Sequence, residues 1–134
     1  MNLGVTLYLQ NSAEAVAFYC KAFNMKVGYH EMNGDGTYLH AELERDGKSI
    51  FAISEATDTD FKAAILSARQ PTMSLGVNLD NDEELNHAYE ALKEGGHILR
   101  PLGPLPWCPA SADIVDKNGV CWYLFVAQYK VDER

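Results

Sequence analysis

The chain has 134 residues, of which 47% are hydrophobic and 22% are charged, and its formal net charge is −8. This length fits one domain with a shared core, because a piece of about 60 residues alone would be only marginally stable. The negative charge argues against nucleic acid and against an anionic membrane surface as partners, since both require a basic surface. No apolar run approaches the ~20 residues that span a bilayer.

The first predicted elements are a strand and a helix near the N-terminus. Residues 4–10 alternate between apolar and polar side chains, which indicates a half-buried strand. Asn11 is then predicted to be a helix N-cap. Glu14, three residues later, is predicted to complete a capping box by accepting from the backbone N–H of Asn11. Apolar residues recur with a helical period after this point, and we expect the helix to end near Asn24.

Three strands are predicted to follow this helix. Residues 26–32 and 37–44 have strand character and are joined by a glycine-rich turn. The pair Asp46-Gly47 marks a second tight turn, and residues 49–54 form the third strand. The first half of the chain therefore has the order strand, helix and three strands.

The second half repeats the strand and helix. Residues 73–79 alternate, Asn81 and Glu84 predict a second capping box, and the helix is expected to end at Glu94 before two glycines. Four residues are identical at an offset of 70 positions: Leu9 and Leu79, Asn11 and Asn81, Glu14 and Glu84, Tyr19 and Tyr89. This internal repeat indicates a duplicated structural unit.

Strands complete the second half as they complete the first. A strand at 97–101 is followed by a segment with four prolines, which we predict to be a loop because proline is excluded from central strands. Strands at 111–116 and 120–127 flank the turn at Asn118-Gly119. The last residues, 130–134, are expected to be a frayed tail.

The order βαβββ therefore occurs twice. We predict an α+β fold in which two βαβββ modules form half-barrel sheets, each with a helix on one face and a concave surface on the other. The chain is expected to be a single domain, 1–134, with module 1 at 1–56, a linker at 57–72 and module 2 at 73–129.

Several stretches, taken with this order, resemble a known family. They are Thr6-Leu7-Tyr8-Leu9 before Asn11 to Tyr19, His40-Ala41-Glu42-Leu43, Glu94-Gly95-Gly96-His97, Trp107, and Asp116 to Trp122. They are similar to the vicinal oxygen chelate superfamily, which includes glyoxalase I, extradiol dioxygenases, and fosfomycin and bleomycin resistance proteins. Within it, they most resemble PhnB-like proteins, the 3-demethylubiquinone methyltransferase-like group. The resemblance implies the glyoxalase/bleomycin-resistance-like fold and, in many relatives, a homodimer.

The resemblance also implies positions for a metal site. Metal-binding members have a His, Gln or Glu ligand on the first strand of each module and another further along each sheet. Those positions fall at Gly4 or Thr6, at Ser74, at Glu42 with His40 on the same face, and at Tyr123. Only His40 and Glu42 are good ligands for a divalent transition metal. We therefore predict an incomplete metal site, with these two residues as the only candidates, and do not favour a metal cofactor.

The inward strand faces carry a mixture of aromatic and polar side chains that suits a small organic ligand. The alternative interpretation is an ordinary polar sheet face and barrel interior. The predicted ligand pocket comprises Thr6, Tyr8, His40, Glu42, Ser74, Asn78, Trp107 and Tyr123.

The leading functional hypothesis is a PhnB-like protein that binds a small molecule without a complete metal site; whether it catalyses a reaction stays open. One alternative is a divalent-metal-dependent lyase, dioxygenase or transferase-type enzyme of the same superfamily. Another is a regulatory or interaction protein. Cys20, Cys108 and Cys121 lack metal-finger spacing, and no signal peptide is recognisable. We therefore expect reduced, inert thiols and a cytoplasmic location.

Overall fold

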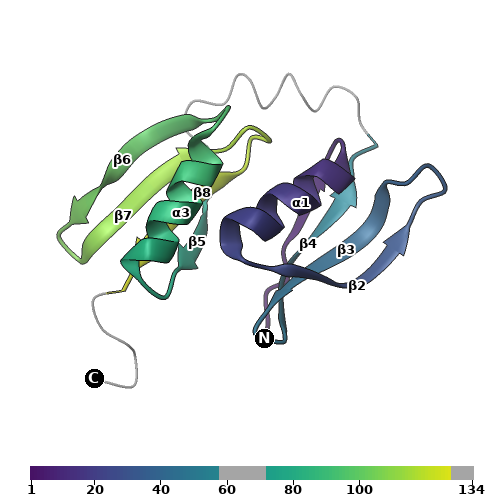
Figure 1. Ribbon diagram of the computed structural model, residues 1–134, viewed down its shortest axis with the longest axis horizontal. Coiled ribbons are helices and arrows are strands. Elements are labelled where there is room, and N and C mark those ends of the chain that lie inside the picture. Colours follow the sequence, from purple (N-terminus) through teal and green to yellow (C-terminus); the bar gives the residue numbers. More distant parts are fainter. Residues whose placement is uncertain (58–71, 128–134) are drawn as a thin grey trace. The chain divides into compact units, whose positions relative to one another are not determined.

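The computed structural model describes residues 1–57 and 72–127. They form two compact units, one on each side of the gap. Each unit is a four-stranded mixed sheet with one helix packed on it (Figure 1). The α+β fold with two βαβββ modules is therefore confirmed, and the single-domain assembly stays a prediction. In the described part of the chain, no helix has the length and apolar character needed to cross a membrane.

Unit 1 contains the first five elements in chain order. They are β1 (Thr6–Leu9), α1 (Ser12–Phe23), β2 (Lys26–Met32), β3 (Tyr38–Arg45) and β4 (Lys48–Glu55). The strand order is β1-β4-β3-β2, with β1 parallel to β4 and the other pairs antiparallel. Asp46 and Gly47 have φ angles of 55° and 77°, as a tight hairpin turn with two left-handed residues requires.

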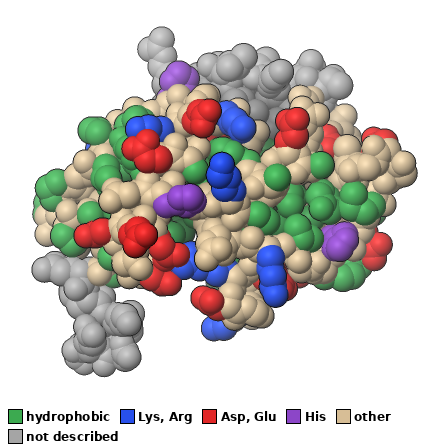
Figure 2. All heavy atoms as spheres, in the orientation of Figure 1, with side chains coloured by type: hydrophobic (Ala, Val, Ile, Leu, Met, Phe, Trp, Pro, Cys, Tyr) green, Lys and Arg blue, Asp and Glu red, His purple; other side chains and the backbone are tan. Residues whose placement is uncertain are grey.

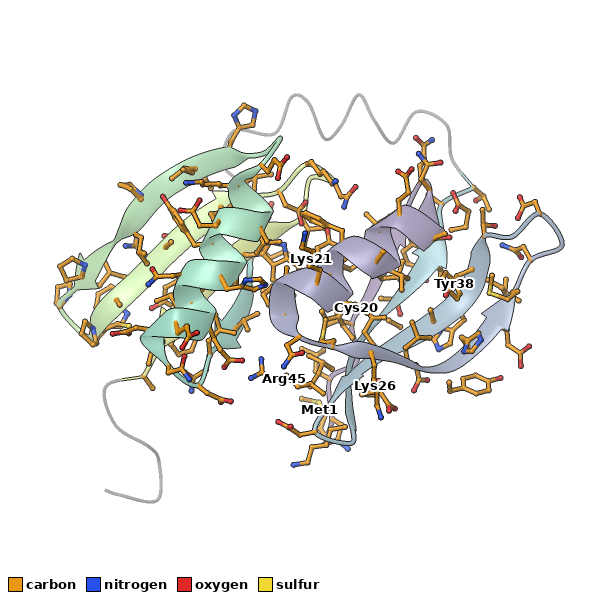
Figure 3. The ribbon with its side chains drawn as sticks, in the orientation of Figure 1. Met1, Cys20, Lys21, Lys26, Tyr38 and Arg45 are labelled. Carbon is orange, nitrogen blue, oxygen red and sulfur yellow. The ribbon has the colours of Figure 1, made fainter. Side chains whose placement is uncertain are left out.

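The core of unit 1 lies between α1 and one face of its sheet. Tyr19 is fully buried, and its ring meets Phe51 of β4 edge-on with centroids 5.8 Å apart. Arg45 reaches from the end of β3 to the last turn of α1, where its Nη1 donates to the Phe23 carbonyl at 3.1 Å (Figure 3). The strand residues that face α1 alternate with residues on the opposite surface of the sheet. In each unit, the surface of the sheet that lies away from the helix is called the open face below.

The start of α1 differs from the prediction. Asn11 has a left-handed conformation, with φ 56° and ψ 53°, and its side chain makes no capping hydrogen bond. Instead, the carboxylate of Glu55 accepts from the backbone N–H groups of Asn11 at 3.1 Å and Ser12 at 2.9 Å. Glu55 lies opposite Leu9 in the parallel pairing of β1 with β4, so a distant strand supplies the cap. The capping box predicted at Asn11 and Glu14 is therefore wrong.

Replacing Glu55 by alanine should lower the free energy of unfolding by about 1–2 kcal/mol, because two N–H groups at the helix start lose their acceptor. Glu14→Ala is the matched control, and we expect a change within about 0.5 kcal/mol. Urea unfolding followed by circular dichroism measures both. A larger loss of stability in Glu14→Ala than in Glu55→Ala would contradict this account and would show that Glu14 does take part in a capping box.

Unit 2 repeats the arrangement. Its elements are β5 (Leu75–Asn78), α3 (Asp82–Lys93), β6 (His97–Leu105), β7 (Cys108–Val115) and β8 (Cys121–Val126), in the sheet order β5-β8-β7-β6. Here the N-cap is confirmed, since Asn81 Oδ1 accepts from Glu84 N at 2.9 Å. The Glu84 carboxylate accepts from Asp80 N, one residue earlier than a capping box requires. Charged side chains gather over α3 on its outer side (Figure 2).

The proline-rich segment also differs from the prediction. It was expected to be a loop, but β6 continues through Pro101 and Pro104, and β7 already begins at Cys108. The reason is that β6 is an edge strand, where proline need not donate to a second neighbour, and its pairing with β7 shifts register three times. The predicted linker, apart from its two end residues, and the predicted tail lie outside the described residues.

A buried carboxylate holds the turn before β8. Asp116 is 3% exposed and accepts hydrogen bonds from Asn118 N at 2.8 Å, Val120 N at 3.1 Å and Trp122 Nε1 at 2.8 Å. Trp122 is fully buried beneath α3. Because side chains alternate along a strand, this anchor places Tyr123 on the open face of unit 2.

Candidate functional site

The open face of unit 1 carries four predicted site residues: Thr6, Tyr8, His40 and Glu42. Thr6 pairs with Ala52 of β4, and Ala52 pairs in turn with Glu42 of β3. Thr6 and Glu42 therefore flank one strand on the same face, about 10 Å apart at the usual strand spacing. Tyr8 lies two residues further along β1, opposite Ser54, and is 58% exposed.

His40 and Glu42 form a direct pair on β3. His40 Nε2 lies 3.1 Å from Glu42 Oε2, and each side chain is 36% exposed. A carboxylate beside one ring nitrogen favours the tautomer with a proton on that nitrogen, which leaves Nδ1 as a proton acceptor. This pair can therefore accept a proton or a hydrogen bond from a ligand.

Two residues of β2 extend this pair, and neither was predicted from the sequence. Glu31 lies opposite His40 in the sheet, and the Tyr29 hydroxyl donates to Glu31 at 2.8 Å. The Tyr29 and His40 rings lie 6.1 Å apart between centroids. The hydrogen bond to Glu31 and that carboxylate's charge raise the pKa of Tyr29, and the charge of Glu42 adds a smaller contribution. The Tyr29 hydroxyl thus serves as a hydrogen-bond donor to Glu31.

The open face of unit 2 carries an aromatic cluster. The rings of Tyr123 and Phe125, both on β8, stack with centroids 4.8 Å apart and an interplanar angle of 17°. Trp107, in the turn between β6 and β7, donates from Nε1 to the Tyr123 hydroxyl at 3.2 Å and is 68% exposed. The structure thus brings together two predicted residues, Trp107 and Tyr123, that are far apart in sequence.

A polar network lies beside this cluster and was also missed. Arg100 Nε donates to Asp113 Oδ2 at 2.8 Å, and its Nη2 donates to Ser111 Oγ at 2.8 Å. Asp113 lies opposite Tyr123 in the sheet, and Ser111 lies opposite Phe125. The alternation of side chains along β7 could have placed Asp113 and Ser111 on this face from the sequence alone. The position of Arg100 could not be predicted in this way, because the pairing of β6 with β7 shifts register on both sides of Arg100.

The remaining predicted residues lie at the edge of unit 2. Asn78 is on β5 opposite Phe125, and its Oδ1 accepts from the backbone N–H of Ala127 at 3.1 Å. Part of its capacity as a polar anchor is therefore used by the backbone. Ser74 is exposed just before β5. The predicted pocket draws on both units, so its assembly stays a prediction.

The cysteines have the properties of inert thiols. Burial raises the pKa of the Cys20 and Cys121 thiols, and nearby aspartates raise that of Cys121 further. Cys108 was expected in a loop but is 3% exposed on β7, where its Sγ contacts the Ala110 and Val126 carbonyls at 3.2 and 3.3 Å. A nucleophilic thiol should be accessible and have a lowered pKa, and neither Cys20 nor Cys121 meets the second condition.

The donor set does not fit a complete transition-metal site. His40 and Glu42 are suitable ligands, but Thr6, Ser74 and Tyr123 offer only hydroxyl oxygens. Across residues 1–57 and 72–127, no three or more His, Cys, Asp or Glu side chains are grouped so that they could hold a metal ion.

Comparison with known proteins identifies the family. Residues 4–123 match the Glyoxalase/Bleomycin resistance protein/Dioxygenase superfamily, and the chain belongs to this superfamily. No curated protein matches the sequence. Among solved structures, the PhnB protein of Bacillus cereus is 26% identical with a TM-score of 0.76, covering 95% of this chain and 100% of that one. The predicted resemblance to the vicinal oxygen chelate superfamily and its PhnB-like group is confirmed.

Two more distant structures share the fold. TioX from a Micromonospora species is 19% identical with a TM-score of 0.64, covering 98% of this chain and 99% of its own. The fosfomycin resistance protein FosX of Listeria monocytogenes, solved with Mn(II) and sulfate, is 16% identical with a TM-score of 0.65. That match covers 100% of this chain and 94% of FosX. At these identities, the similarity supports the fold alone.

Proposed function

We propose that this protein is a PhnB-like binding protein for a small organic molecule and that binding needs no metal. The observation that carries the proposal is the aromatic cluster of unit 2. Trp107, Tyr123 and Phe125 hold one another by a hydrogen bond and a ring stack, with Trp107 largely exposed. An ordered and accessible aromatic surface favours a flat apolar ligand.

Unit 1 taken by itself offers a second set of groups, on its open face, that are proposed to contact a ligand. His40 and Glu42 provide a proton acceptor and a carboxylate only 3.1 Å apart. Thr6 and Tyr8 on the open face of unit 1, and Ser74 and Asn78 at the edge of unit 2, are further proposed ligand contacts, each within its own unit.

Titration of ¹⁵N-labelled protein with 2-ethylnaphthalene and 2-acetylnaphthalene tests this proposal. The two indole N–H signals, assigned with Trp107→Phe, provide a reporter and an internal control. We expect the Trp107 signal to shift on binding while Trp122, which is buried and bound to Asp116, stays in place. If the Trp107 signal does not shift with either probe, at concentrations up to the solubility limit of that probe, the proposed aromatic site is wrong.

A metal-dependent enzyme of the same superfamily is the second candidate, and the His40–Glu42 pair is the observation that favours it. Other residues would have to complete the ligand set. Stoichiometric binding of Mn, Ni, Co or Zn that is lost in His40→Ala would support this candidate. A regulatory role on DNA is disfavoured by the net charge of −8.

We also propose that the protein is a cytoplasmic homodimer. The sheets of both units end in strands with an unpaired edge in the described structure, at β1 and β2 and at β5 and β6. Such edges are usually covered, and a second copy of the chain is one way to cover them. The cysteines are all free, which fits a reducing compartment. Sedimentation velocity at micromolar concentration should show twice the mass of one chain.

A further inference from the structure

We propose that the Tyr123 hydroxyl donates a hydrogen bond to an oxygen atom of the bound ligand and that Trp107 is the residue that positions it. The ligand class is then a planar conjugated molecule that carries a carbonyl or carboxylate oxygen. This inference rests on the proposed function and specifies the contact that selects the ligand.

The direction of the bond between Trp107 and Tyr123 carries the first step. An indole N–H can only donate, whereas a phenolic hydroxyl can both donate and accept. The hydroxyl oxygen of Tyr123 is therefore the acceptor of the 3.2 Å bond. The phenolic proton is left for a different acceptor, and a hydroxyl that already accepts a hydrogen bond is a stronger donor.

The surroundings of the Tyr123 ring carry the second step. Stacking on Phe125 at 4.8 Å limits the motion of the ring, so that its hydroxyl has a defined position. Gly76 lies opposite Tyr123 on β5, and a Cβ built there would be 3.8 Å from the Tyr123 ring and 3.7 Å from Phe125. The two rings therefore lie against the glycine, and a larger side chain at this position would crowd them.

The charges on the face carry the third step. Asp113 lies opposite Tyr123 in the sheet, and its carboxylate would repel an electron-rich ligand oxygen held by the tyrosine. Arg100 offsets this charge through the 2.8 Å bond to Asp113, and Ser111 orients the same guanidinium. An oxygen with partial or full negative charge is therefore compatible with this face.

The test compares two probes that differ in one oxygen, 2-acetylnaphthalene and 2-ethylnaphthalene, by equilibrium dialysis against wild type and Tyr123→Phe. The variant removes the hydroxyl, and with it the acceptor of the Trp107 bond, but keeps the ring that stacks on Phe125; the ethyl probe reports any effect of the lost Trp107 bond. We expect it to weaken binding of the acetyl probe about 3- to 10-fold, the range for one hydrogen bond, and of the ethyl probe less than about 2-fold. Trp107→Phe, which removes the N–H, should weaken the acetyl probe selectively but by less.

Three results would overturn the proposal. Equal weakening of both probes in Tyr123→Phe would mean that the ring matters and the hydroxyl does not. Unchanged binding of both probes would exclude the contact, while the proposed function would stand. Failure of both probes to bind wild type would remove the proposal and the proposed function together. The Trp122 indole signal, recorded for each variant, confirms that the fold is retained.

Discussion

Replacing Asp116 by alanine is expected to lower the free energy of unfolding by about 3–5 kcal/mol, because three donors around one buried carboxylate lose their acceptor. Two of these donors are backbone N–H groups of the turn, and the third is the indole of Trp122. Urea unfolding followed by tryptophan fluorescence measures the effect directly, since Trp122 is one of the two tryptophans.

Asp116→Asn and Glu83→Ala are the controls for this prediction. The asparagine keeps one acceptor oxygen and should cause a smaller loss, whereas Glu83 is exposed on α3 and should change stability by less than about 0.5 kcal/mol. A loss below about 1 kcal/mol in Asp116→Ala would mean that water replaces the carboxylate, and that the turn is not what fixes β8.

Replacing Tyr123 by alanine is expected to weaken the binding of both naphthalene probes by about 30-fold, which corresponds to ~2 kcal/mol for a central aromatic contact. The variant removes one ring of the stack and the acceptor of the Trp107 bond, so the aromatic cluster loses its order. Equilibrium dialysis of both probes measures the loss.

Ile98→Ala is the control, since Ile98 is an exposed apolar residue of unit 2 that pairs with the buried Ile114 and so lies on the other face of the sheet. We expect it to change binding less than about 2-fold. Equal losses in the two variants would show that the probes bind by general hydrophobicity and not at the open face.

The strands and helices of this fold can be predicted from the sequence because the apolar pattern repeats, but the same residues need not have the same role in both copies. Asn11 and Asn81 occupy equivalent positions before α1 and α3. Asn81 caps its helix with its own side chain, while Asn11 is left-handed and Glu55 supplies the acceptors. A cap from a distant strand depends on the β1–β4 pairing and leaves no local signal.

The proline-rich segment illustrates a second limit. Proline is excluded from strands that have a neighbour on each side, and the expectation of a loop assumed such a position. Whether β6 lies at the edge of its sheet depends on the strand order, β5-β8-β7-β6, which only the folded structure provides.

The candidate site was predictable where it depends on alternation along one strand. His40 and Glu42 are two residues apart on β3 and do form a pair. Tyr29 and Glu31 could not be predicted as site residues, because β2 pairs with β3 through two register shifts that sequence spacing does not reveal. Arg100 could not be predicted for the same reason, since the pairing of β6 with β7 also shifts register. Contacts between strands depend on register, and register is set by bulges and turns.

The central claim is that this protein binds a small molecule through its own side chains, without a metal. Equilibrium dialysis of 2-acetylnaphthalene should be carried out with chelator-treated protein and with protein supplemented with Mn, Ni, Co or Zn, alongside elemental analysis. We predict the same affinity within about 2-fold in all samples. Binding that appears only when a stoichiometric metal is present, and that is lost with the metal in His40→Ala, would contradict the claim.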